Sequence, residues 1–422
     1  MPVGIGTSHS EGPPAARGRV ASRSLNICKV WDGDYPWDVR AEKVSAALTT
    51  AGHAVHMVAR NRTGRPIREV LNEATIHRLS PWRWAPGWLN NASMFPAFFN
   101  PRWSQRILEV AQETRADVIL CRDLPLAVPS ILIARRLGIP VILDMAENYP
   151  AMLRSRHATG RTGVADLVIR NPALAAKVER WVLPRLNGIM VVVEESRDRL
   201  VTLGMDPGRI EIVSNTPPLS RLNEGTAQAD GPLPLQLVYI GLLELQRGLA
   251  TVLDAMALLG REGFPAQLSI YGSGVDEGVL RQQALHLGLK SPVVTFHGWV
   301  PNPVLLKHLL AAHAGLIPHW KDESWNTTVP NKLFDYMAAG LPVISSDAVP
   351  AARIVQTTGA GWVFGGRDAT SLASVIKAAA NPDKRRHAAI AGRQAVLNTY
   401  NWENDAKRML ELLNLQQSVR LP

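Results

Sequence analysis

Val329-Pro-Asn-Lys-Leu-Phe-Asp-Tyr-Met-Ala-Ala-Gly-Leu-Pro-Val-Ile344 joins a helix pattern directly to a strand pattern. Pro330 favours the first turn of a helix and Gly340 favours its end, so the spacing predicts a short helix over 331–339. The apolar run 341–344 then predicts a buried strand. A helix that leads straight into such a strand is typical of an α/β fold with a parallel sheet.

Outward from this stretch, short apolar runs keep alternating with helical patterns. Asp38 is placed to cap the first of these helices and Gly52 to end it. The alternation predicts an α/β protein whose parallel sheets carry helices on both faces. The expected strands, from the N-terminus onward, are 25–30, 55–59, 118–121, 141–143, 189–193, 210–213, 235–240, 268–271, 293–296 and 315–317.

The polar segment 222–234 interrupts the alternation and has the composition of a linker. We expect a disordered tail over 1–24, Rossmann-like domains over 25–221 and 235–400, and a C-terminal helix over 401–422 that packs back towards the first domain. Two doubly wound domains joined in this way face each other across a cleft, where ligands bind at the carboxyl ends of the strands.

The composition narrows the class of protein. The chain has 422 residues with 46 Lys+Arg, 36 Asp+Glu and a formal charge of +10, which favours an anionic partner. Its 2 cysteines exclude a disulfide framework and indicate a reducing compartment. Because the tail has no apolar signal core and no apolar run approaches the roughly 20 residues that span a bilayer, we expect a cytoplasmic protein whose only membrane contact would be peripheral.

The predicted helix of the opening stretch carries Lys332 and Asp335 on one face, because they lie three residues apart. A helix N-terminus with a lysine suits a phosphate, and a carboxylate one turn on suits a pair of sugar hydroxyls. An exposed ion pair explains the same spacing equally well. A second segment, 239–248, ends a strand at Gly241 and opens a helix after Arg247, which is the layout of a pyrophosphate site.

These two segments resemble the family 4 glycosyltransferases (glycosyl transferases group 1), which have the GT-B fold, and the resemblance covers most of the chain. It implies that Asp335 holds the nucleotide ribose and that Arg247 and Lys332 neutralise the donor diphosphate. Thr327 stands where the family has an acidic residue near the donor sugar, and Leu242 stands where it has an arginine. The C-terminal domain would then bind the nucleotide sugar, and the N-terminal domain would bind the acceptor.

Further donor contacts implied by the resemblance come from loops that follow strands. The glycines of 268–274 and the segment around His297 would lie beside the nucleotide; a tight turn and a hydrogen-bonded loop histidine are the alternatives. The implied donor contacts are Gly241, Arg247, Gly272, Gly274, His297, Gly298, Thr327, Lys332, Leu333 and Asp335.

The first β-to-α loop is expected to shape the acceptor site. It has Gly33 where the family usually has a glycine pair, and Trp37 and Arg40 add bulk and charge. Glu147, at the end of a later strand, matches a carboxylate of the family, and a carboxylate in a cleft is costly unless it is used or paired. The residues expected to act in catalysis are Arg247, Lys332 and Glu147.

Aromatic and basic residues interleave over 81–106, and basic residues with few acids follow over 154–185. Tryptophan with arginine suits anchoring at an anionic membrane surface, at about 1 kcal/mol per cation near that surface. Core aromatics beside a solvated charged face are an equally good explanation. Nucleic acid is not expected as a partner, because the sequence contains no recognisable groove-reading module.

The resulting hypothesis is a retaining glycosyltransferase of the hexosyltransferase class. It would move a sugar from a nucleoside diphosphate sugar to a lipid-linked or saccharide acceptor in polysaccharide or glycolipid biosynthesis. The resemblance implies that no metal and no further cofactor is needed. Two alternatives stay open: a GT-B nucleotide-sugar epimerase and, given Thr327 and Leu242, a non-catalytic GT-B binding or scaffold subunit.

Overall fold

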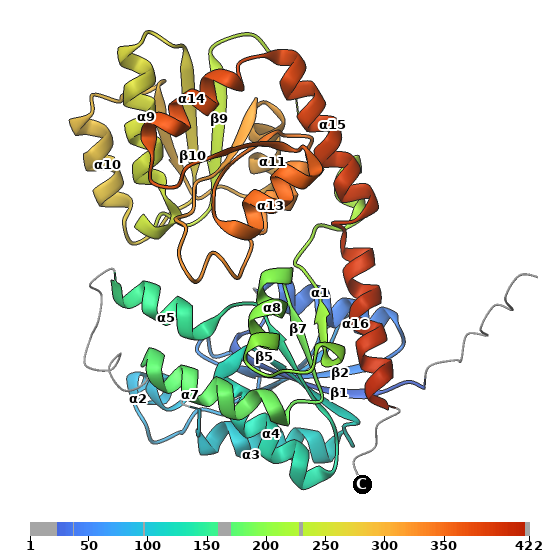
Figure 1. Cartoon of the computed structure of the whole chain (residues 1–422). Coiled ribbons are helices and arrows are strands. Elements are labelled where there is room, and N and C mark those ends of the chain that lie inside the picture. The colour runs from blue at the N-terminus through green and yellow to red at the C-terminus, as the bar shows by residue number, and fades with distance from the viewer. Residues whose placement is uncertain (1–22, 37, 96–97, 159–169, 228–230, 418–422) are drawn as a thin grey trace, which may run out of the picture.

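The computed structural model describes residues 23–36, 38–95, 98–158, 170–227 and 231–417. Within these ranges the chain forms two α/β domains, which lie one above the other in Figure 1. Each domain has one largely parallel sheet with helices packed against it, so the expected class of two doubly wound α/β domains is confirmed.

The N-terminal sheet has the order β3-β4-β2-β1-β5-β6-β7-β8, and all pairings are parallel except that of β3 with β4. Its strands are β1 (Asn26–Asp34), β2 (Ala54–Arg60), β3 (Arg68–Val70), β4 (Thr75–Arg78), β5 (Val118–Arg122), β6 (Val141–Met145), β7 (Gly188–Val191) and β8 (Ile210–Ile212). The helices around it are α1 (Val39–Thr50), α2 (Gly87–Ser93), α3 (Pro101–Glu113), α4 (Ala127–Leu137), α5 (Tyr149–Ala158), α7 (Pro172–Val182) and α8 (Glu194–Thr202).

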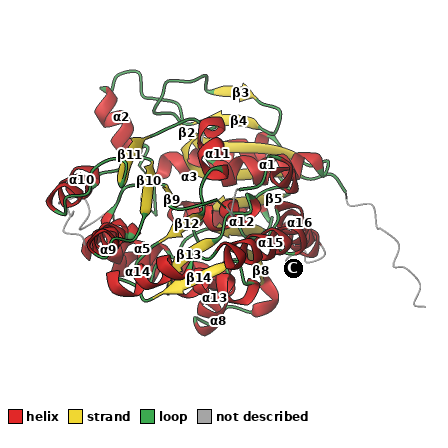
Figure 2. Cartoon of the chain, turned by 90° about the horizontal axis from the view of Figure 1, so that it is seen from above, coloured by secondary structure: helices red, strands yellow, loops and turns green. Residues whose placement is uncertain are grey.

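The C-terminal sheet has the order β11-β10-β9-β12-β13-β14 and is parallel throughout (Figure 2). Its strands are β9 (Leu235–Ile240), β10 (Ala266–Tyr271), β11 (Val294–Gly298), β12 (Ala314–Ile317), β13 (Val343–Ser346) and β14 (Gly361–Phe364). Its helices are α9 (Leu249–Arg261), α10 (Glu277–His286), α11 (Asn302–Leu310), α12 (Lys332–Ala338), α13 (Val349–Thr358), α14 (Ala369–Ala378) and α15 (Pro382–Asn398).

The last helix, α16 (Trp402–Gln417), returns to the N-terminal domain, as Figure 1 shows on one side of the molecule. Met409 and Leu412 are buried in the same core cluster as Ile27 of β1. Arg408 Nε also donates to the Ile212 carbonyl of β8 at 2.8 Å. The end of the chain therefore completes the core of the domain that the start of the chain builds.

Direct contacts hold the two domains together in this structure. Ser155 Oγ of α5 lies 2.8 Å from Asp322 Oδ2, and Arg353 Nε of α13 donates to Glu195 Oε1 of α8 at 2.7 Å. Thr328 Oγ1 also donates to a backbone carbonyl of the N-terminal domain at 3.3 Å. These contacts flank the space between the two sheets, so that space is enclosed by both domains.

Candidate active site

A cleft of about 810 Å³ lies between the domains, next to the carboxyl ends of strands from both sheets. We call it the main cleft, and its volume is in the range of small-molecule sites. Its polar lining residues are Asp38, Arg40, Arg122, Glu147, Ser155 and Asn215 from the N-terminal domain, and Gln246, Arg247, Ser324, Thr328, Asn331, Lys332 and Asp335 from the C-terminal domain.

Lys332 begins α12 and extends its amine to the end of β9. Nζ donates to the Ile240 carbonyl at 2.8 Å and lies 3.8 Å from the centroid of the Tyr239 ring. Burial, and then the positive charge of Arg247, lower the pKa of Lys332 well below its usual value. A bound anion would offset both effects, so this position favours a negatively charged ligand.

Arg247 ends a 3-10 turn (Leu245–Arg247) that follows β9, and its guanidinium lies 5.0 Å from the centroid of the Trp325 ring. The next residue, Gly248, has a φ of 78°, and a Cβ there would come within 1.7 Å of the Pro318 carbonyl oxygen. Only glycine can adopt this φ and leave room for the Pro318 carbonyl. The approach holds the turn and the start of α9 against the loop that follows β12.

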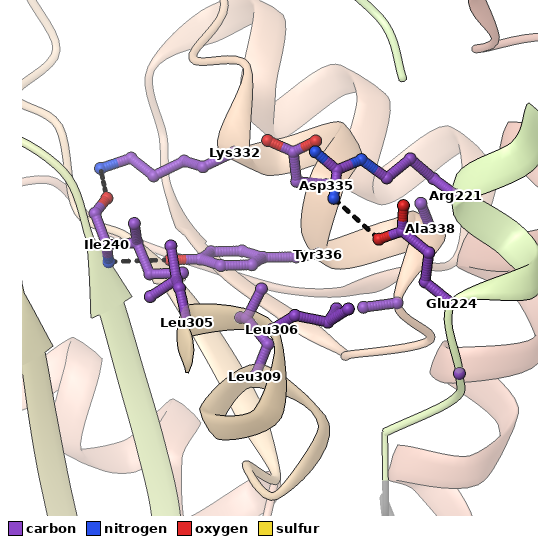
Figure 3. Close-up of a pocket in the computed structure, with 12 residues that line it drawn as sticks. Arg221, Glu224, Ile240, Leu305, Leu306, Leu309, Lys332, Asp335, Tyr336 and Ala338 are labelled. Carbon is purple, nitrogen blue, oxygen red and sulfur yellow. Dashed lines mark hydrogen bonds and ion pairs between the residues drawn. The ribbon is translucent and has the colours of Figure 1, made fainter. Parts of the chain in front are cut away.

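Asp335 lies in the first turn of α12, and its side chain is exposed to the cleft. Figure 3 shows its carboxylate beside the guanidinium of Arg221, which pairs with Glu224 at 2.7 Å. The Ile240 backbone N–H donates to the Tyr336 hydroxyl at 3.1 Å. That bond ties α12 to β9 and thereby fixes where Asp335 stands.

A small pocket of about 100 Å³, which we call the linker-side pocket, opens beside Asp335 (Figure 3). Leu305 and Leu309 of α11 supply apolar wall, and Arg221 and Glu224 supply the charged rim. The pocket shares Lys332 and Asp335 with the main cleft, so a ligand bound along α12 can extend into it.

The structure thus brings part of the predicted site together. The predicted residues that line the main cleft are Gly241, Arg247, Lys332 and Asp335 from the C-terminal domain and Arg40 and Glu147 from the N-terminal domain. Those described but not among its lining residues are Gly33, Gly272, Gly274, His297, Gly298, Thr327 and Leu333. Trp37 lies outside the described residues.

The glycines after β10 have a structural explanation. Gly272 has a φ of 129°, and a Cβ there would lie 2.0 Å from the Gly241 carbonyl oxygen. A Cβ at Gly274 would lie 2.3 Å from the Leu243 carbonyl oxygen. The loops after β9 and β10 therefore pack directly on one another, and this packing requires both glycines. Their contact with a donor stays a prediction.

Thr327 and Leu333 are not among the residues that line the main cleft, and their contact with a donor stays a prediction. Thr327 Oγ1 donates to the carbonyls of Glu323 at 3.0 Å and Ser324 at 3.2 Å, so the hydroxyl is used by its own loop. Leu333 is fully buried in the core beneath α12. Thr328, the next residue after Thr327, lines the cleft instead.

His297 stands at the edge of the C-terminal sheet. It stacks on Tyr271 with ring centroids 4.4 Å apart, and His308 of α11 lies 5.0 Å from the same tyrosine. Both histidines are exposed and cover Tyr271, which is 2% exposed, and this group of rings lies outside the main cleft. The placing of His297 and Gly298 beside a nucleotide base stays a prediction.

On the acceptor side, Arg40 is engaged in a buried ion pair. It is 2% exposed, and Nε and Nη2 donate to Asp144 Oδ1 at 2.8 and 2.6 Å. Arg122 Nη1 lies 3.8 Å from the other Asp144 oxygen. Arg40 lines the main cleft while its guanidinium is held by Asp144, and its contact with an acceptor stays a prediction. Gly33 is needed for packing, because a Cβ there would meet the Trp31 ring at 2.5 Å.

Two cationic residues of the site escaped sequence reasoning. Arg122 ends β5, so a charged residue at the end of an apolar run was the signal that could have found it. Lys43 of α1 donates to Asn215 Oδ1 at 2.9 Å, and the charges of Lys43 and Asp335 interact across the domain boundary. No sequence signal marks Lys43, because its partners come from other elements.

Among the described residues, no group of three or more His, Cys, Asp or Glu side chains could hold a metal ion. The expectation that no metal is needed stays a prediction. Within the same ranges, no helix is both long and apolar enough to cross a membrane.

Two family models match the chain, one on each domain. The model described as "Glycosyl transferase 4-like domain" matches residues 38–216, and the model described as "Glycosyl transferases group 1" matches residues 234–381. Among curated proteins, the glycogen synthase of Mycobacterium tuberculosis is 22% identical over 386 residues, which cover 86% of this chain and 87% of the relative. A phosphatidyl-myo-inositol mannosyltransferase of Mycobacterium leprae is 27% identical over 169 residues, which cover 40% of this chain and 43% of the relative.

Solved structures match over both domains. Sucrose-phosphate synthase from Thermosynechococcus elongatus aligns with a TM-score of 0.73 at 18% identity, covering 93% of this chain and 99% of that one. HepE from Anabaena, solved in complex with UDP and glucose, aligns with a TM-score of 0.65 at 14% identity, covering 92% and 99%. These matches show the two-domain GT-B fold.

Proposed function

The chain belongs to the group 1 glycosyltransferases of GT-B fold, and from this premise we propose that it transfers a sugar from a nucleoside diphosphate sugar to a lipid-linked or saccharide acceptor, with retention of the anomeric configuration. The observation that carries the proposal is that Lys332, Arg247 and Asp335 converge on one wall of the main cleft. Two cations suit a diphosphate, and a carboxylate one turn away suits ribose hydroxyls.

The donor would lie along α12. Its diphosphate would meet Lys332 and Arg247, its ribose Asp335, and the apolar wall of the linker-side pocket would contact the nucleoside. HepE, which shares the fold, was solved with UDP and glucose, and this supports the donor class without fixing the base or the sugar here.

Transfer breaks the bond between the anomeric carbon and the diphosphate oxygen and joins that carbon to an acceptor oxygen. Negative charge then grows on the diphosphate while the sugar becomes oxocarbenium-like, so fixed cations stabilise the transition state more than the ground state. In the proposed reaction the acceptor proton passes to an oxygen of the leaving diphosphate, and the acceptor enters on the face that this group leaves. Glu147, on the opposite wall, would orient the acceptor hydroxyl.

The experiment that tests this function is an incubation of the full chain with UDP-, GDP- and dTDP-sugars, with and without a membrane extract. Diphosphate release together with a labelled product that depends on the extract supports transfer. An epimerised sugar without extract would instead support the epimerase alternative. If the chain binds none of the nucleotide sugars in the panel, the proposal is contradicted and a binding or scaffold subunit is favoured.

Asp335→Asn is predicted to weaken binding of the donor nucleotide by about 10- to 100-fold, because it removes a charged hydrogen-bond acceptor from the ribose. Titration calorimetry with the nucleoside diphosphate measures the change. Asp383→Asn is the matched control, because Asp383 is an exposed carboxylate on α15, away from the cleft. Equal nucleotide affinity of Asp335→Asn and the parent would refute the ribose role.

We also propose that the N-terminal domain docks on an anionic membrane surface. Trp84 and Trp88 are 73% and 72% exposed, Phe99 is 69% exposed, and Arg83 lies exposed among them. Not all aromatic residues of the segment 81–106 are exposed, because Trp103 is fully buried and belongs to the core. The exposed part combines interfacial aromatic rings with cations, which is the chemistry of a peripheral membrane contact.

Vesicle binding is therefore predicted to require anionic lipid and to weaken as salt rises, since the surface potential decays within a Debye length of about 10 Å at 0.1 M salt. Co-sedimentation with anionic and neutral vesicles at low and high salt measures it. Replacing both Trp84 and Trp88 by alanine should reduce the bound fraction. Leu285→Ala, at a position 67% exposed on α10 of the other domain, is the control. Equal partition in all four conditions, or none, would contradict membrane docking.

A further inference from the structure

A second pocket, of about 450 Å³, adjoins the main cleft on the side of α5. We call it the outer pocket, and its walls come from α5 of the N-terminal domain and from the loops after β9, β12 and β14 of the C-terminal domain. Side chains that line it include Arg154, Ser155, Gln246, Trp320, Glu323 and Arg367. Because Ser155, Gln246 and Ser324 line both spaces, a molecule in the main cleft can continue into the outer pocket.

Two cations and two carboxylates line the outer pocket, so the charges of its lining balance. Arg154 and Arg367 stand against Asp322 and Glu323, and Arg154 Nε donates to Glu323 Oε2 at 2.9 Å. A phosphate gains little from such a lining, because two carboxylates offset the two cations and Arg154 is already paired with Glu323. A neutral ligand rich in hydroxyl groups gains more, because planar polar side chains can both donate to it and accept from it.

Trp320 adds an aromatic surface to this polar lining. The guanidinium of Arg367 lies 3.9 Å from the centroid of the Trp320 ring, and the Trp320 Nε1–H is buried with no hydrogen-bond acceptor among the described residues. A buried donor without a partner is costly. Because this N–H has no exposed surface, a ligand in the pocket would contact the indole ring, and a ligand hydroxyl would reach the N–H only after the side chain shifts. An indole beside planar polar groups favours a sugar ring.

The outer pocket exists because the two domains are close together. Ser155 Oγ of α5 lies 2.8 Å from Asp322 Oδ2 and 3.1 Å from Gln246 Oε1, so hydrogen bonds across the domain boundary form one of its edges. A ligand that contacts both walls binds this arrangement better than a more open one. Occupancy of the outer pocket would therefore favour domain closure.

We propose that the outer pocket binds the sugar residues of the acceptor that lie beyond the reacting hydroxyl, so that the preferred acceptor is an oligosaccharide chain. This inference rests on the proposed function, because it assigns the acceptor of the same cleft. According to this inference, the protein recognises its acceptor through a saccharide chain and not through a lone phosphate headgroup.

The test is titration calorimetry on the full chain, first with UDP, GDP and dTDP, and then with sugars in the presence of the nucleotide that binds. The probes are glucose, maltose and maltotriose, the corresponding α-1,6-linked mannose series, and inorganic phosphate. We expect affinity to rise by about tenfold from a monosaccharide to a trisaccharide in one of the two series. Trp320→Ala should abolish this gain, and Trp320→Phe, which keeps a smaller aromatic ring, should reduce it.

Nucleotide affinity should stay unchanged in both Trp320 variants, and this shows that each variant is folded. Leu285→Ala, at a position 67% exposed on α10 and outside both pockets, is the control and should keep the gain. No gain with chain length, a gain that persists in Trp320→Ala, or a response to phosphate alone would overturn the inference. Absence of any nucleotide binding would instead overturn the proposed function.

Discussion

Arg247→Ala and Lys332→Ala are each expected to lower kcat/KM by roughly 30- to 1,000-fold. This corresponds to an activation free energy higher by about 2 to 4 kcal/mol. The effect is large because both cations are held in place before the donor arrives. Lys332 Nζ is fixed by the Ile240 carbonyl and the Tyr239 ring, and Arg247 lies over the Trp325 ring. A cation in place before reaction pays no reorganisation cost as charge develops on the diphosphate.

Lys321→Ala is the matched control for this pair of variants. Lys321 belongs to the same domain, but it is 51% exposed and pairs with Asp347 at 3.2 Å. Its loss should leave kcat/KM near the parental value. Donor turnover at the parental rate in both Arg247→Ala and Lys332→Ala would show that the diphosphate binds elsewhere.

The pH dependence of nucleotide binding gives a second readout for Lys332. In the free protein, burial and Arg247 lower the pKa of Lys332, whereas a bound diphosphate would raise it. Between these two pKa values, binding takes up a proton, so nucleotide affinity should fall as the pH rises through that window. Lys332→Arg stays charged and should remove this pH dependence. A pH dependence equal in Lys332→Arg and the parent would assign it to another group.

The fold followed from the sequence because most strands are apolar runs between clear helix signals. Asp38, for example, caps α1 as predicted, with Oδ1 accepting from the Ala41 N–H at 2.7 Å. The strands that escaped prediction are β3, β4 and β14. They are three or four residues long, and β3 and β14 lie at sheet edges, so neighbouring strands define them more than their own periodicity does.

Sequence alone predicted the candidate site only where the position of a residue in its own helix or strand determines which way its side chain points. Lys332 and Asp335 share a face of α12, and that face lines the cleft. Thr327 could not be placed in this way, because its hydroxyl donates to the Glu323 and Ser324 carbonyls of its own turn. The ion pair of Arg40 could not be predicted either, since its partner Asp144 lies 104 residues further along the chain. Long-range pairings of this kind are set by packing and leave no local pattern.

Asp144→Asn is expected to destabilise the N-terminal domain by about 3 to 5 kcal/mol, because it leaves a buried cation without its counter-ion. Asp144 is 0% exposed, and Arg40 and Arg122 flank it on either side. Burial alone would raise the pKa of Asp144, but these guanidiniums outweigh it and hold the pKa below its usual value. Hydrogen exchange of the β1, β5 and β6 amides measures the free energy of opening in this domain.

Glu109→Ala on α3 is the control for this variant, because the ion pair of Glu109 with Arg106 is partly exposed and should contribute no more than about 1 kcal/mol. The double variant Arg40→Met with Asp144→Leu should cost less than Asp144→Asn alone, since it removes Asp144 together with one of its two guanidiniums, and the other, Arg122, keeps Asp38 at 3.1 Å.

The role of Arg40 can be tested by measuring how the destabilisation caused by Asp144→Asn varies with pH. The folded pKa of Asp144 is depressed, so its stabilisation is complete above the ordinary carboxyl pKa of about 3.9 and is lost as the pH falls through the folded value. The difference between parent and variant should therefore be full at pH 7 and shrink in acid. If Asp144→Asn instead kept parental stability and raised only the KM for the acceptor, the guanidinium of Arg40 would be available to substrate, and its place in a structural ion cluster would be refuted.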